Sequence, residues 1–478
     1  MGRTPLELNA DRIFDPDPSI RRIGRELYDG IKDLPLVCPH SHVDPKLFSL
    51  NEPLPEPTNL LVVSDPCILR MLHSQGIPLD LLGIPRTDGS VAEFDPRDVW
   101  KLFADFWYLF RGTPTAIWME QLLHDVFGIR ERLSPDSALD IYDAIATALA
   151  TPEFLPRSLF DRFNIEVLAT NNPATGTLTE HEAIRSSGWA GRVIPTFRPD
   201  SLFRIGSPGW RNEIDFLSIS SATDIDSYRD FIDALENRRA EFRSLGGTAT
   251  DHCVASPFAE RLPSSEADRL FSAAMSRRVT RDDERRFEAH MLMESARMSI
   301  DDGMVMQIHP GVLYDHNEEL AGQFGRDKGG DIPIGVEYTR RLHALLNTYG
   351  NDLRLTLIVF TLDESTYGRE LAPLAGVYPA LRLGAPWWFN DSVEGMARFR
   401  ASVTETAGIY NTAGFTDDIR SFWSIPARHD LARRVDANWL AGLVTRHILD
   451  LGDAREMAHA LAYDIPRATY KLDQPLTG

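Results

Sequence analysis

Two histidines spaced for one side of a short strand are the sharpest chemical feature of the sequence. The segment PHSHVD at 39–44 follows a short apolar run, and residues i and i+2 of a strand point to the same side. His40 and His42 would therefore converge at the strand's C-terminal end, where barrel enzymes build their sites. Two imidazoles suit Zn, Fe, Mn, Co or Ni, so the pattern predicts a metal site.

A carboxylate from another strand would complete such a site. The last apolar segment ends in FTDDIRSF, which offers Asp417 and Asp418, with Arg420 two residues beyond the second aspartate. In a closed barrel the eighth strand lies beside the first, so an aspartate there can reach the histidine pair. A His-His-Asp set leaves coordination positions open, as a catalytic metal requires. The alternative role for an aspartate here is a helix N-cap, and the two aspartates can divide these roles.

Eight short apolar or β-branched segments recur between helical patterns. Apolar strands separated by helices predict a parallel sheet covered on both faces. Eight of them favour a (β/α)8 barrel of the TIM type over a doubly wound sheet. The predicted strands are 34–39, 165–170, 192–197, 247–251, 304–309, 355–361, 380–385 and 410–417.

The gap between the first two predicted strands is far longer than one helix needs, so we expect a helical insertion after strand 1. The predicted divisions are an N-terminal segment with strand 1 over 1–44, the insertion over 45–160, and the rest of the barrel over 161–478. A second, charged helical excursion is expected near 253–300.

Composition excludes several classes of partner. The chain has 478 residues, 43% of them hydrophobic, and a net charge of −20. Such a charge repels phosphate backbones and anionic lipid, so neither nucleic acid nor membrane is an expected partner. The three cysteines (Cys38, Cys67 and Cys253) form no CxxC pair, which favours a reducing compartment. Without a signal-peptide pattern or an apolar run of about 18 residues, we expect a cytoplasmic protein.

The His-x-His after strand 1 and the Asp-x-Arg after strand 8 resemble those of the uronate isomerases, also called glucuronate isomerases, within the amidohydrolase group. Four further blocks follow in the order expected of that family, and the resemblance spans about residues 10–472. These blocks are TFRPD at 196–200, TDH at 250–252, MQIHPG at 306–311 and PWWFND at 386–391.

The resemblance implies isomerisation of an acidic sugar, D-glucuronate to D-fructuronate and D-galacturonate to D-tagaturonate, with one divalent metal ion. It implies metal ligation by His40, His42 and Asp418, with Asp418 also a proton carrier. Zn²⁺ is the first choice of ion, and Mn, Fe, Co and Ni remain alternatives. The family is also compatible with a homo-oligomer.

The same resemblance assigns residues to the substrate. Such a reaction needs a base near one carbon, an acid near the oxygens, and positive charge for the enediolate. Arg198 and Arg420 would hold carboxylate and hydroxyl groups, and His309 would act in catalysis. The predicted pocket residues are Trp387, Trp388, His252, Tyr314 and Cys67. Core packing is the alternative for the tryptophans and for His309, and His252 can instead belong to a polar strand-end pair.

Two departures from the family pattern keep other functions open. Pro66 and Cys67 stand where the family usually has a His-Tyr pair, and Tyr314 replaces an arginine. The chain could therefore isomerise or epimerise a different sugar acid. It could also be a metal-dependent hydrolase or decarboxylase, and both His252 and His309 on the metal would favour hydrolysis. A non-catalytic binding protein is the remaining alternative.

Overall fold

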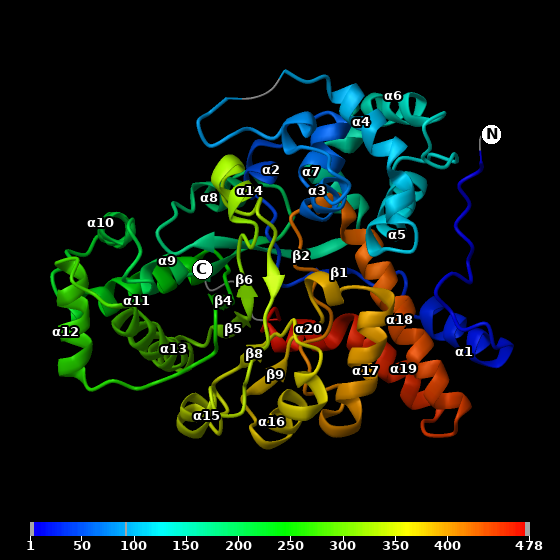
Figure 1. Cartoon of the computed structure of the whole chain (residues 1–478). Coiled ribbons are helices and arrows are strands. Elements are labelled where there is room, and N and C mark those ends of the chain that lie inside the picture. Colours follow the sequence, from blue (N-terminus) through cyan, green and yellow to red (C-terminus); the bar gives the residue numbers. More distant parts are fainter. Residues whose placement is uncertain (1–3, 91–92, 474–478) are drawn as a thin grey trace.

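The computed structural model describes residues 4–90 and 93–473, and a parallel sheet curled into an α/β barrel lies at its centre (Figure 1). Seven strands pair in the order β1-β2-β3-β4-β5-β8-β9, each parallel to its neighbour. The predicted barrel architecture is confirmed. Its strands are β1 (Leu36–Cys38), β2 (Ile165–Pro173), β3 (Val193–Arg198), β4 (Ala249–Val254), β5 (Val305–Pro310), β8 (Leu357–Val359) and β9 (Leu381–Leu383).

Residues 410–417 close the barrel without forming the regular strand that the sequence predicts. The Leu383 amide donates to Asn411 O (2.9 Å) and the Ala413 amide donates to Leu383 O (2.8 Å), which makes a single bridge to β9. Left-handed backbone at Gly414 (φ 77°) and Asp418 (φ 39°) interrupts the extended conformation that a longer ladder needs. The predicted full strand is therefore wrong, although the segment does lie between β9 and β1.

Helices fill the long connection between β1 and β2, as predicted. Prolines at the first helical turn fix the starting φ of most of them, including α3, α4 and α5. Figure 1 shows α3 to α6 gathered on one side of the barrel. The bounds are α2 (Lys46–Leu50), α3 (Pro66–His73), α4 (Pro96–Asp105), α5 (Pro114–Gln121), α6 (Ala138–Leu149) and α7 (Pro156–Arg162).

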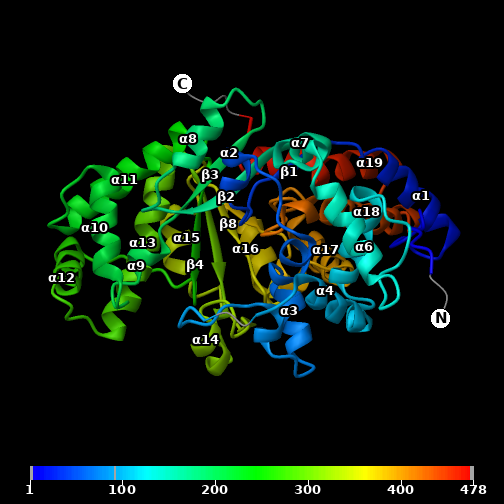
Figure 2. The same cartoon turned by 90° about the horizontal axis from the view of Figure 1, so that it is seen from above.

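The remaining helices surround the sheet, and Figure 2 places α10 to α12 at one end of the molecule and α1, α18 and α19 at the other. None of the helices in the described part of the chain has the length and apolarity to cross a membrane. Before β5 they are α1 (Pro18–Asp29), α8 (Thr179–Ser186), α9 (Asp200–Phe203), α10 (Trp210–Ser221), α11 (Tyr228–Ser244), α12 (Ser264–Met275) and α13 (Arg281–Asp302). After β5 they are α14 (Glu318–Phe324), α15 (His343–Tyr349), α16 (Ala372–Val377), α17 (Val393–Ala407), α18 (Ile425–Thr445), α19 (Leu451–His459) and α20 (Ile465–Thr469).

An excursion after β5 is a feature that sequence patterns did not predict. Two-residue strands β6 (Val312–Leu313) and β7 (Ile332–Pro333) pair antiparallel, with α14 between them. The Thr87 amide of the insertion donates to Gln323 O at the end of α14 (2.8 Å). The excursion therefore contacts the insertion beyond the C-terminal end of β5.

Residues 470–472 fill the opposite, N-terminal end of the barrel. Tyr470 and Leu472 are buried in one apolar cluster with residues of the barrel strands. Lys471 Nζ donates to Gly303 O (2.8 Å), just before β5, and Arg192 Nη1 donates to Leu472 O (2.7 Å), just before β3. Because these partners precede their strands, the C-terminal segment seals the barrel floor and leaves the carboxyl ends of the strands for a site.

Phe360, which directly follows β8, packs closely against His309, one of the predicted site residues. The Phe360 ring stacks on the His309 ring at a centroid distance of 3.9 Å. β8 lies between β5, which carries His309, and β9, and a Cβ at Gly384 directly after β9 would lie 2.3 Å from Phe360. The glycine is therefore required for the ring to keep its position against His309.

We expect Gly384→Ala to destabilise the protein by about 1–3 kcal/mol, the usual cost of overpacking a core. The added methyl group would push Phe360 toward His309, and the free energy of unfolding in urea measures the cost. Gly376→Ala is the matched control, because the nearest atom to its new Cβ lies 3.8 Å away. Equal stability of both variants would contradict this packing role of Gly384.

Candidate metal centre and the groups around it

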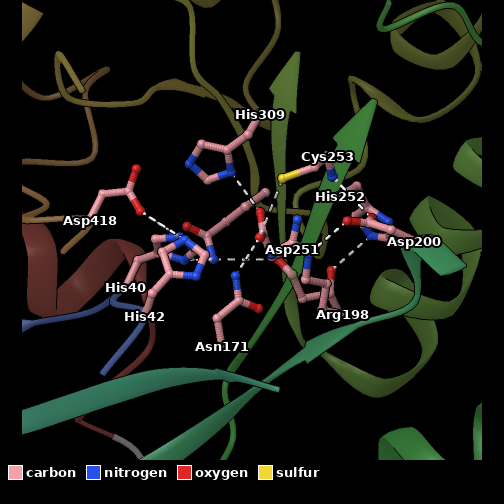
Figure 3. A network of polar contacts seen from close by, with 12 residues as sticks. His40, His42, Asn171, Arg198, Asp200, Asp251, His252, Cys253, His309 and Asp418 are labelled. Carbon is pink, nitrogen blue, oxygen red and sulfur yellow. Dashed lines mark hydrogen bonds and ion pairs between the residues drawn. The ribbon is translucent and has the colours of Figure 1, made fainter. Parts of the chain in front are cut away.

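His40, His42 and Asp418 meet where the barrel closes, as the sequence predicts (Figure 3). Asp418 Oδ1 lies 3.3 Å from His40 Nε2 and 3.1 Å from His42 Nε2. His40 and Asp418 are almost fully buried, whereas the His42 side chain is 27% exposed to solvent. Two nitrogens and one oxygen therefore converge at the C-terminal end of β1, with one edge open to solvent.

Backbone hydrogen bonds across the seam hold these groups together. The Asp418 amide donates to His40 O (3.2 Å), and the His42 amide donates to Ile419 O (2.7 Å). Asp418 itself adopts the left-handed conformation, which costs a non-glycine residue about 1–3 kcal/mol. The surrounding structure tolerates this strain, and strain of this kind clusters at functional sites.

The donor set fits a divalent cation. Metal bonds of about 2.0–2.2 Å to nitrogen and oxygen set ligand atoms roughly 3.0–3.5 Å apart, and the two Asp418 contacts lie within that range. Apart from these imidazoles, no described residue donates a hydrogen bond to the buried Asp418 carboxylate. Burial acts to raise the pKa of Asp418, but the imidazoles beside it hold that pKa well below its usual range. The carboxylate is thus ready to hold a cation.

The neighbouring Asp417 faces a different group. Its Oδ2 lies 3.6 Å from His429 Nε2, and His429 Nε2 lies 3.6 Å from Cys38 Sγ. Cys38, Asp417 and His429 are all buried, and their arrangement could also hold a metal ion. The idea that one aspartate caps a helix is wrong, because the 3-10 turn that follows begins at Phe422 with Ser421 as its N-cap.

A second polar group surrounds His309 at the end of β5. His309 Nδ1 lies 2.6 Å from Asp251 Oδ1, and Asn171 Nδ2 donates to Asp251 Oδ2 (2.7 Å). The His309 ring stacks on that of His40 at 4.9 Å, so the two groups adjoin. Although buried, His309 Nε2 has no hydrogen-bond partner among the described residues. In the neutral tautomer whose Nδ1–H donates to Asp251, His309 presents a free Nε2 lone pair.

Arg198 supplies positive charge at the end of β3. Its Nε donates to Asp200 Oδ2 (2.7 Å), and Asp200 Oδ1 accepts the Cys253 amide (3.0 Å). Burial acts to lower the pKa of Arg198, but the carboxylates of Asp200 and Asp251 raise it above the usual value. The guanidinium is therefore a fixed cation, and its Nη atoms have no acceptor among the described residues. In Figure 3, Asp251 lies between Arg198 and the histidine pair.

The aromatic residues predicted for the pocket lie beside His309. Trp387 meets the His309 ring edge-on at 4.9 Å, and Trp388 lies 4.6 Å from Trp387. Trp387 is also 4% exposed and belongs to a core cluster against which Trp388 and Tyr314 pack. Trp387 is therefore both a core residue and a neighbour of the site. Trp388 adopts left-handed backbone (φ 49°), another strained position next to the site.

Three predicted residues are not brought to this group. His252 lies on the opposite face of β4 from Asp251, because successive strand residues alternate. Its ring stacks on Phe203, and its Nε2 contacts Thr250 Oγ1 at 3.1 Å.

The left-handed turn at Asp418 breaks the Asp-x-Arg alternation, so Arg420 is 54% exposed and pairs with Asp327 (3.3 Å). Cys67 is exposed at the start of α3.

Sequence reasoning missed Asp251 and Asn171 as members of the site. The TDH block drew attention to the end of β4, but alternation alone cannot tell which of Asp251 and His252 faces inward. The structure settles that choice, because Asp251 shares the face of its β5 register partner Gln307, whose side chain contacts His40 inside the barrel. Asn171 had no signal, since it lies within a strand that was predicted to end at residue 170.

This arrangement can bind a metal ion and move a proton. Two imidazoles and a carboxylate offer ligands, His309 Nε2 can accept a proton, and Arg198 can hold an anion. Both His252 and His309 on the metal would favour the hydrolase alternative, but His252 points away from this site. The geometry therefore disfavours that alternative.

Comparisons with known proteins show the family to which the chain belongs. A family model described as glucuronate isomerase matches residues 20–469. A uronate isomerase of Nostoc punctiforme is 50% identical over 467 residues, which cover 98% of each chain. The crystal structure of glucuronate isomerase from Caulobacter crescentus has a TM-score of 0.97 at 47% identity and covers 99% of this chain and 98% of its own. That of uronate isomerase from Thermotoga maritima has a TM-score of 0.90 at 26% identity, with coverage of 97% and 99%.

We expect Asp418→Asn to weaken the binding of Zn²⁺ by more than about 100-fold, because losing a ligand exceeds the 10–100-fold typical of an outer partner. Competition with a fluorescent chelator measures the affinity. His290→Gln is the matched control, since His290 is a buried histidine that bonds Tyr228 Oη (2.9 Å) outside the site. Unchanged affinity in Asp418→Asn would rule out this donor set.

Proposed function

Because the chain belongs to the glucuronate isomerase family, we propose that it interconverts D-glucuronate with D-fructuronate and D-galacturonate with D-tagaturonate at a mononuclear metal site. The observation that carries the proposal is the proximity of three groups. These are the His40–His42–Asp418 set, the unpartnered His309 Nε2, and the Arg198 guanidinium. An aldose–ketose isomerase needs ligands for the sugar oxygens, a proton carrier and a cation for an acidic substrate.

His309 is suited to carry the proton between the adjacent carbons of the sugar. His309 Nδ1 lies 2.6 Å from Asp251 Oδ1, and when Nδ1–H donates to this carboxylate, Nε2 can take a proton from one carbon and return it to the other. The reaction moves a proton from C2 to C1 and one between the two oxygens, and it changes no net charge. Asp418 is the second candidate carrier, because its carboxylate lies at the same centre.

His40, His42 and Asp418 would hold the divalent ion, with Zn²⁺ as first choice and Mn, Fe, Co or Ni as alternatives. When bound, such an ion polarises or anchors the sugar oxygens and stabilises the negative charge of an enediolate. The chain supplies the ligands at a nearly dry seam, since His40 and Asp418 are 1% and 3% exposed. In this proposal Asp418 is both a metal ligand and a candidate proton carrier.

Arg198 is the group that would select an acidic sugar. The protein carries a net charge of −20, so its overall field repels a uronate. The guanidinium, held through Nε by Asp200, leaves its Nη atoms for a carboxylate. Trp387, Trp388 and Tyr314 would border the sugar on the His309 side. Arg420 could join them only by leaving Asp327.

We expect the purified, metal-loaded protein to isomerise D-glucuronate and D-galacturonate at a rate in the usual enzymatic range of about 1–1000 per second. Ketose formation measures the reaction. His40→Ala, prepared in parallel, should be inactive and so excludes a contaminating host enzyme. Absence of turnover in protein that retains its metal would overturn the proposed substrates.

We further expect Asp251→Asn to lower kcat by about 10²–10⁴-fold, the usual contribution of a general acid–base group. The amide would not stabilise His309 in its charged form as a carboxylate does, and it can turn its NH₂ group toward Nδ1. The variant's metal content is measured alongside kcat, because Asp251 also lies near His40. Asp302→Asn, which loses an ion pair with Arg239 outside the site, is the control. An unchanged kcat in Asp251→Asn would exclude the His309–Asp251 pair from the chemistry.

A further inference from the structure

A chain of buried polar groups connects His40 with the barrel floor. Gln307 Nε2 lies 3.5 Å from His40 Nδ1 and 3.4 Å from Thr250 O. The Tyr470 hydroxyl donates to Gln307 Oε1 (2.9 Å). Gln307 and Tyr470 have no exposed surface. The C-terminal segment thus contacts the back of the candidate metal centre through one amide side chain.

This amide orientation suits a metal-free His40. With the Gln307 NH₂ group toward it, Nδ1 acts as an acceptor and carries no proton. A neutral imidazole then carries its proton on Nε2, which faces Asp418 Oδ1 at 3.3 Å. Both contacts are satisfied as long as Nε2 binds no cation.

Metal ligation through Nε2 reverses these requirements. A ligating imidazole has no proton on the ligand nitrogen, so a neutral His40 carries its proton on Nδ1. The Nδ1–H group would then face the Gln307 NH₂ group, and two donors cannot bond each other. Metal-bound histidines almost always donate their other N–H to a carboxylate, a carbonyl or water. The Oε1 atom of the same amide is such an acceptor, and a half-turn about the last side-chain bond exchanges it with Nε2.

We propose that Gln307 is a positioning residue whose amide reverses when a divalent ion binds His40, with Tyr470 as the partner that permits the reversal. In the loaded state Gln307 Oε1 accepts the His40 Nδ1 proton, and Gln307 Nε2 donates to Tyr470 Oη. His40 stays neutral, because it gives up the Nε2 proton and takes one at Nδ1. This inference rests on the proposed metal role of His40.

Tyr470 can accept from the reversed amide because its own proton has another acceptor. Thr416 Oγ1 is buried and has no hydrogen-bond partner among the described residues. Burial raises the pKa of Tyr470, and the neighbouring Thr416 side chain acts to lower that pKa. The hydroxyl can therefore turn from Gln307 to Thr416. Since Thr416 precedes Asp417 and Asp418, the reversed network joins the segments that carry His40 and Asp418.

The test compares Gln307→Glu with Gln307→Met in Zn²⁺ affinity, measured by chelator competition on metal-free protein. A carboxylate can only accept, so Gln307→Glu matches the loaded state and should bind Zn²⁺ at least as tightly as the parent protein. Gln307→Met fills similar space without an acceptor and should bind about 10–100-fold more weakly. If Gln307→Glu binds as weakly as Gln307→Met, Gln307 does not serve as an acceptor and the proposal fails.

Two controls separate this effect from loss of stability. Gln121→Met removes another buried amide, which bonds Asp430 (3.1 Å) away from the site. Its Zn²⁺ affinity should not change, and thermal unfolding of each metal-free variant shows that it is folded. If His40→Ala binds Zn²⁺ as tightly as the parent protein, the proposed metal site fails. If only the Gln307 series shows no difference, the site stands and the amide reversal fails.

Tyr470→Phe tests the partner in the same assay. The reversed amide would lose the acceptor of its NH₂ group, so Zn²⁺ affinity should fall, by less than in Gln307→Met. Tyr228→Phe is the matched control, because it also removes a hydroxyl bonded to a histidine, His290, and Tyr228 packs against a separate core cluster. Equal affinity in Tyr470→Phe and the parent protein would overturn the role of Tyr470.

Discussion

The barrel closes between the end of β1 and residues 418–419, and two backbone hydrogen bonds at this seam place both halves of the candidate metal centre. One bond runs from Asp418 to His40 and the other from His42 to Ile419. Because these bonds use the ligand residues or their neighbours, the closure of the barrel and the spacing of the donor atoms are one constraint. The left-handed turn at Asp418 is part of it, since it directs Asp418 toward His40 and His42 and Asp417 toward His429.

Charge compensation decides the arrangement around this seam. Buried carboxylates are costly unless they are paired, and each of them here has a cationic or imidazole neighbour. Asp251 pairs with His309, Asp200 with Arg198, and Asp418 with the histidine pair. The same pairing that makes these carboxylates tolerable in the interior also orients His309 and Arg198 for a ligand. In a protein of net charge −20, this local pairing matters more than the overall field.

Side-chain contacts connect the barrel floor with the candidate metal centre. Tyr470 is packed with apolar strand residues as part of the core, yet its hydroxyl contacts Gln307, which contacts His40. A segment whose burial stabilises the fold therefore also bears on a metal ligand. At the other end of the barrel, Asp327 of the excursion between β6 and β7 pairs with Arg420, two residues after Asp418.

The sequence by itself determined the barrel and the histidine pair, because local patterns carry these features, whereas Asp418 was separated from Asp417 only through the family resemblance. Apolar strand periodicity predicts the sheet, and spacing of two along a strand predicts that His40 and His42 share a side. Only the tertiary structure decided that Asp251 rather than His252 faces His309. It alone also showed that Arg420 turns outward and that Tyr470 reaches Gln307. These outcomes depend on which face of a strand points inward, on a left-handed residue that breaks alternation, and on contacts between residues far apart in the chain. None of these is a property of a local segment.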